Sequence, residues 1–322
     1  MSNRLKLTLS FLMVGGFCTW LLATVPDGKL RLRYLMIHTD DAGMCHSMNV
    51  ATMESLERGI VTSASIMPPC PGFDEFAVWA ESHPEYDYGV HLTLTNETRR
   101  FTWGPVLPKE KVSSLVDQDG NFWRTSQEVA KHAQREHVEL ELRAQIEKAL
   151  EAGIRITHMD NHMYSLLGRQ DLIELYVELG LEYDLPIRLR RVDTMPLKQR
   201  AEFYGGLLEA YAQAGEKLDD HQMPLFAYAE SDNYDAPPDE KRNHFVNAVR
   251  TLPGGVSEFI IHCGYKETTG PEPPYISGRQ EDFRVFNSLE MDRELKRHGI
   301  QLLNWEQFRQ MREAGQFPLG SE

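Results

Sequence analysis

Short apolar runs alternate with amphipathic stretches along this chain from residue 32 to near its end. The apolar runs have the length and composition of buried strands, and they cover residues 32–38, 60–67, 88–94, 154–160, 187–191, 224–230, 257–264 and 300–305. Helical periodicity fills the intervals, at residues 47–58, 73–81, 126–152, 170–182, 198–214, 238–251 and 282–298, and a last helix closes the chain. Such alternation predicts a parallel β-sheet with helices packed outside it.

The number of β/α units narrows the fold class. Seven or eight units in strict alternation favour a TIM-like α/β barrel, complete or incomplete, over a doubly wound sheet. The first strand leads into Asp41-Ala42-Gly43 and not into the glycine-rich sequence that binds phosphates in nucleotide-binding sheets. Residues 95–125 show no clear period, and an irregular insertion of that length is usually functional or mobile.

The N-terminal segment differs from the rest of the chain. Residues 7–25 carry no charge and follow Arg4 and Lys6, which is typical of a secretory signal or an uncleaved membrane anchor. We therefore expect a signal peptide or anchor over residues 1–29, one domain over residues 30–322, and a location outside the cytoplasm, exported or anchored. A core helix is the alternative, but the segment has no polar face.

Charge and cysteine content exclude some classes of function. The net charge is −14, and nucleic-acid binding requires Lys and Arg clusters that this chain lacks. An acidic surface that keeps the protein soluble is the simpler interpretation. Without the N-terminal segment, three cysteines remain, Cys45, Cys70 and Cys263, and an odd number cannot form a complete disulfide framework. Small buried side chains are the expected role for all three.

Acidic and imidazole side chains stand where predicted strands end. Asp40 and Asp41 end the first strand, and His91 and His262 lie in the later parts of two others. In parallel β/α folds these strand ends meet at one face, so ligands distant in sequence can reach one metal ion. Taken singly, an Asp-Asp pair is usually a loop and a lone histidine is usually a hydrogen-bonded core residue. The shared position indicates a metal-dependent hydrolase.

A third cluster supports this interpretation. His158, Asp160 and His162 have alternating spacing, so in an extended strand end they lie on one face. A carboxylate and two imidazoles leave open positions on a divalent ion, as in hydrolytic sites, and imidazoles suit Zn²⁺, Mn²⁺ or Fe²⁺ better than Mg²⁺. The chain has no G-x-S-x-G sequence and no cysteine-nucleophile signature, so a covalent nucleophile is not expected.

Five motifs follow one another in an order typical of a known family. They are HTDDAG at 38–43, GIVTSASIM at 59–67, GVHLTL at 89–94, THMDNH at 157–162 and EFIIHCGY at 258–265. In these motifs the chain resembles the YdjC-like carbohydrate deacetylases, which include enzymes of the chitooligosaccharide deacetylase type. The resemblance extends from residue 32 to about residue 305.

The resemblance implies a deacetylase-like catalytic domain that removes an N-acetyl group from an amino sugar or oligosaccharide with one divalent metal ion. Carried over by position, the metal ligands are Asp41, His91 and His162. Asp40 matches the general base and His262 the acid near the leaving amine. The substrate-binding residues stay unassigned.

The resemblance also implies supporting residues, a metal ion and a binding partner. His158 and Asp160 match side chains that support the ligands without touching the metal. Members of the family are commonly described with Mg²⁺, whereas imidazole ligands favour Zn²⁺, so either ion is compatible. The expected partner is the acetylated sugar; a homodimer is left open, nucleic acid is not expected, and membrane contact is expected only through the N-terminal segment.

Three departures from the family pattern bear on the substrate. His38-Thr39 stands where the family usually has Asn-Ala, Cys263 replaces a frequent proline, and the apolar leader is absent from cytoplasmic members. The leader implies an extracytoplasmic glycan or cell-wall fragment. Trp103, Trp123 and Tyr164 are candidates for sugar stacking or core packing. Two alternatives stay open: another metal-dependent hydrolase acting on a phosphoester or a different amide, and a sugar-binding protein without turnover.

Overall fold

The structure, a computed structural model, describes residues 32–58, 60–98, 101–189, 205–220, 227–230, 237–266 and 275–315. The expected leader over residues 1–29 lies outside these ranges, so the extracytoplasmic location stays a prediction. Within them, no helix has both the length and the apolar character needed to cross a membrane.

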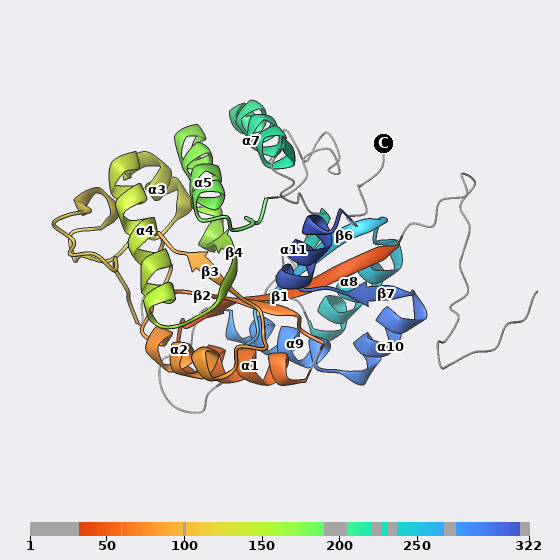
Figure 1. The fold of residues 1–322 in the computed structure, drawn as a ribbon. Helices are drawn as coiled ribbons and strands as arrows, with labels where there is room; N and C mark the ends of the chain where they lie inside the picture. Colours follow the sequence, from red (N-terminus) through yellow and green to blue (C-terminus); the bar gives the residue numbers. More distant parts are fainter. Residues whose placement is uncertain are drawn as a thin grey trace, which may run out of the picture. The chain divides into compact units, whose positions relative to one another are not determined.

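The strands form one parallel sheet of seven (Figure 1). Six of them lie in the order β4-β3-β2-β1-β6-β5, and β7 pairs with β1 beside this path. Their bounds are β1 Arg33–Ala42, β2 Ser63–Ile66, β3 Tyr88–Leu92, β4 Ile156–Asn161, β5 Ala227–Glu230, β6 Gly255–Ile261 and β7 Ile300–Leu302. The predicted parallel α/β architecture is confirmed.

Strand β1 organises this sheet because it has neighbours along both edges. One edge pairs with β6 from Arg33 to Thr39. The other pairs first with β7, over Arg33–Leu35, and then with β2 from His38 onward. Strands β4 and β5 end the strand order and do not pair with each other in the described residues. The sheet is thus an open, curled half-barrel, the incomplete form of the predicted barrel.

The helices follow the strands and pack against one another outside the sheet. Helix α1 contacts α2 and α9, α8 contacts α9 and α10, and α5 contacts α4 and α7 (Figure 1). Their bounds are α1 His46–Glu57, α2 Phe73–Ser82, α3 Ser126–His132, α4 Arg135–Glu151, α5 Gln170–Glu182, α7 Leu208–Asp220, α8 Pro238–Thr251, α9 Ile276–Phe286, α10 Leu289–Arg297 and α11 Trp305–Glu313.

Two predicted long helices are each divided in the structure. The helix predicted over 126–152 breaks at Ala133, which is extended, and Arg169 Nη1 binds the carbonyls of Ala130 and Ala133 at 3.1 and 2.8 Å. The helix predicted over 282–298 becomes α9 and α10, and the Ser288 side chain caps α10 by accepting the Met291 N–H. Side-chain contacts at helix ends therefore override the continuous periodicity.

Other differences concern segments with weaker patterns. The strand predicted over 187–191 is described only to residue 189, where Ile187 makes a single bridge to Met159. The helix predicted over 198–214 begins later, as α7, after a short 3₁₀ turn at Gly205–Leu207. In the irregular insertion, Trp103 is buried and donates its ring N–H to the Thr95 carbonyl. Trp103 is therefore a core residue and not a sugar platform.

Side chains that alternate along β1 face the main hydrophobic core on one side of the strand and the polar residues at its carboxyl end on the other. Leu35 and Ile37 belong to the main hydrophobic core, whereas Met36 packs with Trp305 and Phe308 of α11. Since side chains alternate along a strand, His38 and Asp40 share the face of Met36. Helix α11 thus fills that face near the start of β1 and leaves its carboxyl end for polar side chains.

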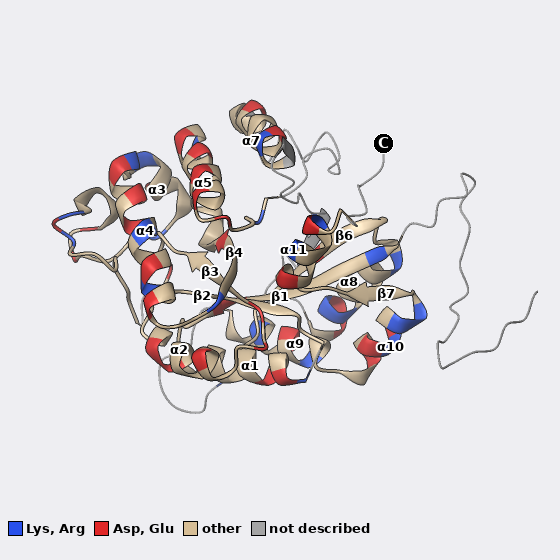
Figure 2. Ribbon diagram, viewed as in Figure 1, with Lys and Arg blue, Asp and Glu red and all other residues tan. Residues whose placement is uncertain are grey.

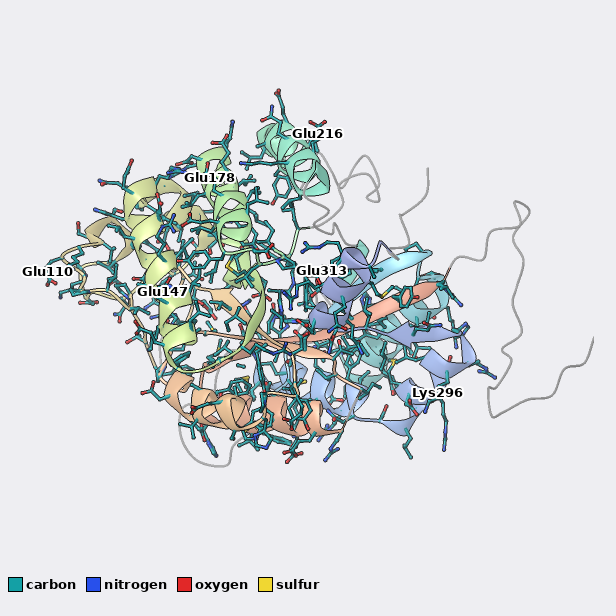
Figure 3. All side chains as sticks on the ribbon, in the orientation of Figure 1. Glu110, Glu147, Glu178, Glu216, Lys296 and Glu313 are labelled. Atoms are coloured by element: carbon teal, nitrogen blue, oxygen red, sulfur yellow. The ribbon has the colours of Figure 1, made fainter. Side chains whose placement is uncertain are left out.

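The acidic balance of the chain is spread over the helices. Figure 2 shows Asp and Glu on most helices with Lys and Arg among them, while the strands carry few charges. In Figure 3 the labelled side chains, Glu110, Glu147, Glu178, Glu216, Lys296 and Glu313, extend away from the ribbon, and all are exposed. This pattern agrees with the expected solvated acidic surface.

Candidate metal centre and active site

A local backbone distortion turns two adjacent carboxylates toward one cavity. Neighbouring residues of a strand normally face opposite sides. Asp41 instead has a φ of 69°, in the left-handed region, and the pairing of β1 with β2 shifts register between Thr39 and Ala42. Asp tolerates this conformation better than most residues. As a result Asp40 and Asp41 both line the cavity.

Three donor atoms from three strand ends form a small triangle. The Asp41 Oδ1 atom lies 3.2 Å from His91 Nε2 and 3.1 Å from His162 Nδ1, and these two nitrogens are 3.2 Å apart. Donors bound about 2.1 Å from one ion in tetrahedral or octahedral geometry are roughly 3.0 to 3.4 Å apart. The triangle therefore has the size of a metal-binding face.

The far sides of both imidazoles are held by carboxylates. His91 Nδ1 lies 2.7 Å from Asp160 Oδ1, and His162 Nε2 lies 3.0 Å from Glu97 Oε2. Where a metal ion replaces the second ring proton, each carboxylate accepts the remaining ring N–H and leaves the nitrogen near Asp41 as the ligand atom. The buried Asp41 Oδ1 atom receives no hydrogen bond of ordinary geometry from the described residues, whereas Oδ2 pairs with Arg279. The donor set fits a divalent cation.

The charges around the triangle are unbalanced. Burial alone would lower the pKa of His91, but Asp160 and Asp40 outweigh it and raise that pKa to about 10. For His162, Glu97 and Asp41 likewise overcome burial and raise the pKa to about 9. The surrounding carboxylates thus favour positive charge at this point, which either protons or a metal ion can supply.

The base candidate Asp40 is held by a buried guanidinium. Arg188 Nη1 and Nη2 bind Asp40 Oδ2 and Oδ1 at 2.8 and 2.9 Å. The same side chain binds Glu258 through Nε at 3.1 Å and lies 3.0 Å from Asp160 Oδ2. Burial, partly offset by Arg188, raises the pKa of Glu258 to about 7. One guanidinium therefore orients three carboxylates.

His262, the candidate acid, also lies near Asp40. Its Nε2 is 4.0 Å from Asp40 Oδ2, and its backbone N–H donates to Asp282 Oδ2 at 3.0 Å. Asp282 in turn pairs with the buried Lys241 at 2.9 Å. Burial, reinforced by Arg279, holds the pKa of His262 well below its usual value, so the ring is neutral at rest.

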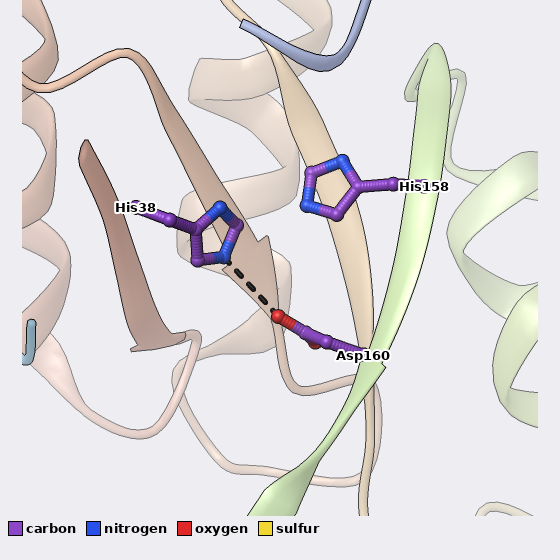
Figure 4. Close-up of side chains that lie close together, drawn as sticks. All are labelled: His38, His158 and Asp160. Atoms are coloured by element: carbon purple, nitrogen blue, oxygen red, sulfur yellow. Dashed lines mark ion pairs between the residues drawn. The ribbon is translucent and has the colours of Figure 1, made fainter. Parts of the chain in front are cut away.

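A second imidazole cluster consists of His38, His158 and Asp160 (Figure 4). His38 Nε2 is 3.2 Å from Asp160 Oδ2, and its ring meets His158 edge-on at 4.9 Å. The His158 ring stacks on Trp305 at 4.5 Å. Arg188 already lies 3.0 Å from the same Asp160 oxygen, and burial with Arg188 lowers the pKa of His38 to about 3. We interpret this cluster as support for the residues that line the cavity, because Asp160 contacts both His91 and Arg188.

The cavity has a volume of about 120 Å³. All five residues expected to act as ligands or catalysts line it, namely Asp40, Asp41, His91, His162 and His262. Asp160 contacts His91, as expected of a supporting group. His158 contacts His38 and lies one step further from the cavity.

Four charged residues of the site were not foreseen from the sequence. Arg188 and Glu258 stand inside predicted strands. Glu258 is a charge in an apolar run, which is a signal of a buried pair, whereas Arg188 is one of three arginines in its strand and is not singled out. Glu97 follows the third strand, and Arg279 Nη1 lies 2.7 Å from Asp41 Oδ2. No local pattern marks Glu97 or Arg279, because each reaches the site only through the folded arrangement.

Comparison with known proteins identifies the family of the chain. The family model described as YdjC-like protein matches residues 34–297. A protein named carbohydrate deacetylase from Enterococcus faecalis is 30% identical over 278 residues, 84% of this chain and 97% of the relative. One of the same name from Thermoanaerobacter pseudethanolicus is 28% identical over 234 residues, 73% of this chain and 82% of the relative.

A solved structure shows the same fold. The crystal structure of an Enterococcus faecalis protein described as a cellobiose-phosphate cleavage protein superposes with a TM-score of 0.67 at 25% identity. The superposition covers 86% of this chain and 99% of that one. With the family match over residues 34–297 and relatives aligned over most of their length, this chain belongs to the YdjC-like family.

Proposed function

We propose that this protein is a metal-dependent carbohydrate deacetylase that hydrolyses the N-acetyl amide of an amino sugar or oligosaccharide. The triangle of Asp41, His91 and His162 beside Asp40 carries the proposal. Relatives named carbohydrate deacetylase align over most of the chain, which supports the same activity here. The reaction class is amide hydrolysis.

Asp41, His91 and His162 are the proposed holders of the ion. A bound divalent cation supplies Lewis-acid polarisation of the acetyl carbonyl and lowers the pKa of a coordinated water. Two imidazoles among three protein ligands favour Zn²⁺, Mn²⁺ or Fe²⁺ over Mg²⁺. Asp160 and Glu97 keep both rings in the ligating tautomer.

Asp40 is the proposed general base. Its carboxylate lines the cavity next to the triangle, with Oδ2 3.9 Å from His91 Nε2. Arg188 occupies one lone pair of each oxygen and leaves further acceptor capacity for the proton of an attacking water. The guanidinium fixes the direction of this acceptor, which is the positioning that proton transfer requires.

His262 is the proposed acid for the departing nitrogen. Because its pKa is held well below the usual value, the ring begins neutral and must receive a proton before it can donate one. Asp40 Oδ2 is 4.0 Å away, close enough for the abstracted proton to pass to His262 after a small movement. Because its pKa is low, the protonated imidazole readily gives its proton to the departing nitrogen.

Acetate release tests the proposal. The purified protein is incubated with N-acetylglucosamine and its oligomers, before and after removal of metal by a chelator and after addition of Zn²⁺, Mn²⁺ or Mg²⁺. We expect acetate release that stops on chelation and returns with an imidazole-preferring ion. Phosphate release from phosphorylated sugars without acetate would point to a phosphoesterase, and calorimetric binding without turnover would point to a sugar-binding protein.

A further inference from the structure

Unusual backbone conformations are concentrated at the cavity. Among the described residues other than glycine, five have a positive φ, and four of these line the cavity: Asp41, Met163, Tyr164 and Tyr275, at 69°, 53°, 53° and 58°. Only Asp184, at 51°, lies elsewhere. Glycine adopts this conformation without strain, whereas bulky side chains do so only when the surroundings hold them. The side chains at these positions therefore have a role beyond the turn.

Polar side chains make up most of the cavity lining. Nine of the residues that line it are charged or polar, and the other three are Met163, Tyr164 and Tyr275. The polar part suits the amide of an acetamido group, and the three larger side chains remain for the sugar ring that carries this group.

Two of these larger side chains are accessible to a ligand. Tyr275 and Met163 are 50% and 47% exposed, whereas the three proposed metal ligands are buried. Tyrosine suits a sugar because its ring packs against the C–H face of a pyranose while its hydroxyl bonds to sugar hydroxyl groups. Tyr164 and Tyr275 come from different segments, one after β4 and one before α9, and line the same cavity.

From this arrangement we propose that Tyr164 and Tyr275 form the subsite for the pyranose ring whose N-acetyl group enters the cavity. The inference rests on the proposed deacetylase function and assigns the residues that hold the sugar ring beside the reacting amide. Met163 adds an apolar edge to the same subsite. The polar cavity then recognises the acetamido group, and the tyrosines recognise the ring.

The segments that carry both tyrosines are held by hydrogen bonds to residues at or near the proposed metal site. The His162 carbonyl accepts the Ser165 N–H at 3.1 Å, which fixes the turn that carries Tyr164. The Tyr275 carbonyl accepts the Arg279 N–H at 3.1 Å, and Arg279 binds Asp41. The Met163 carbonyl also accepts a hydrogen bond from Ser126 Oγ. The subsite is therefore preorganised, which reduces the entropy lost when a sugar binds.

Glycine substitutions provide the test because they relieve backbone strain while they remove the ring. The variants Tyr164→Gly and Tyr275→Gly are compared with Tyr275→Phe, which keeps the ring, and with Asp184→Gly, which relieves the same strain away from the cavity. Binding of N,N′-diacetylchitobiose is measured by calorimetry in an Asp40→Asn background, in which the sugar is not consumed. Inhibition by acetohydroxamate, which has the acetyl group but no ring, is measured for each variant in the active background.

We expect each tyrosine-to-glycine change to weaken sugar binding by about tenfold, with the acetohydroxamate inhibition constant and the unfolding temperature unchanged or improved. Tyr275→Phe and Asp184→Gly should bind the sugar within about twofold of the parent. Sugar binding by both glycine variants at the parent affinity would overturn the subsite. Failure of the wild-type protein to release acetate would instead contradict the proposed function, since calorimetric binding is measured independently of turnover.

Discussion

Arg188 binds Asp40 through two parallel hydrogen bonds, Nη1 to Oδ2 at 2.8 Å and Nη2 to Oδ1 at 2.9 Å. This fork geometry fixes the plane of the carboxylate as well as its position. Because Arg188 also lies 3.0 Å from Asp160 Oδ2, it connects the proposed base to the carboxylate that orients His91. Base and metal ligand are therefore held in one arrangement by a single side chain.

Replacing this guanidinium by an ammonium tests that role. Arg188→Lys keeps the buried positive charge but cannot form the two-point contact with Asp40. We expect kcat to fall by about 10- to 100-fold, with the metal content measured by mass spectrometry unchanged. Arg143→Lys, at a partly exposed position on α4, is the matched control and should leave kcat intact. Equal kcat for Arg188→Lys and wild type would show that orientation of Asp40 by Arg188 is unimportant.

Two variants should distinguish the role of the general base from that of the metal ligands. Asp40→Asn preserves shape and removes the proton acceptor, so we expect a loss of about 10²- to 10⁴-fold in kcat with one metal ion still bound. His162→Ala removes one corner of the triangle and should lose both metal and activity. Metal content and acetate release are measured on the same samples. Retention of stoichiometric metal in His162→Ala would contradict the ligand assignment.

The positions of these residues were predictable only in part. Alternating strands and helices placed Asp40, His91, His162 and His262 near the carboxyl ends of strands, and that placement follows from local pattern alone. That Asp41 joins Asp40 on the same side depends on its left-handed φ and the register shift of β1, which no periodicity reports. Contacts between segments distant in sequence decide on which side of a strand such a side chain lies.

Charge pairing was the least predictable part of the site. Arg188 and Glu258 are separated by 70 positions, and they meet only in the folded half-barrel, where Arg188 lies beside β4 and Glu258 lies on β6. Likewise the break between α3 and α4 is stabilised by Arg169, whose guanidinium binds carbonyls 36 and 39 positions away. A sequence pattern reveals which residues are out of place in a strand or helix, but not which partner compensates them.

Glu258 should make stability depend on pH. Its pKa is raised from 4.5 to about 7 because burial outweighs the attraction of Arg188. The folded protein then holds a proton that the unfolded chain releases above pH 4.5, so this contribution is full below that pH and is lost as pH rises through about 7. Glu258→Gln cannot ionise and removes the dependence.

Urea unfolding at pH 5 and pH 8 measures the effect of Glu258. From pH 5 to pH 8 we expect the wild type to lose up to about 3 kcal/mol of free energy of unfolding relative to Glu258→Gln. Substitution of the exposed Glu136 by Gln is the control and should show no such gain. A constant difference between Glu258→Gln and wild type at both pH values would mean that Glu258 is ionised throughout.

The last prediction concerns the ion pair behind His262. Lys241 is 1% exposed and its Nζ lies 2.9 Å from Asp282 Oδ1, while Asp282 Oδ2 accepts the His262 N–H at 3.0 Å. Lys241→Met leaves a buried carboxylate without its cation, and we expect a loss of about 3 to 5 kcal/mol in the free energy of unfolding.

Asp282→Asn in the same chain removes the charge but keeps an oxygen for the His262 N–H. The double variant should therefore recover most of the lost stability, because breaking a buried pair costs more than replacing it. A double-mutant cycle by urea unfolding measures this coupling, and simple additivity of the two single changes would show that the pair does not act as a unit.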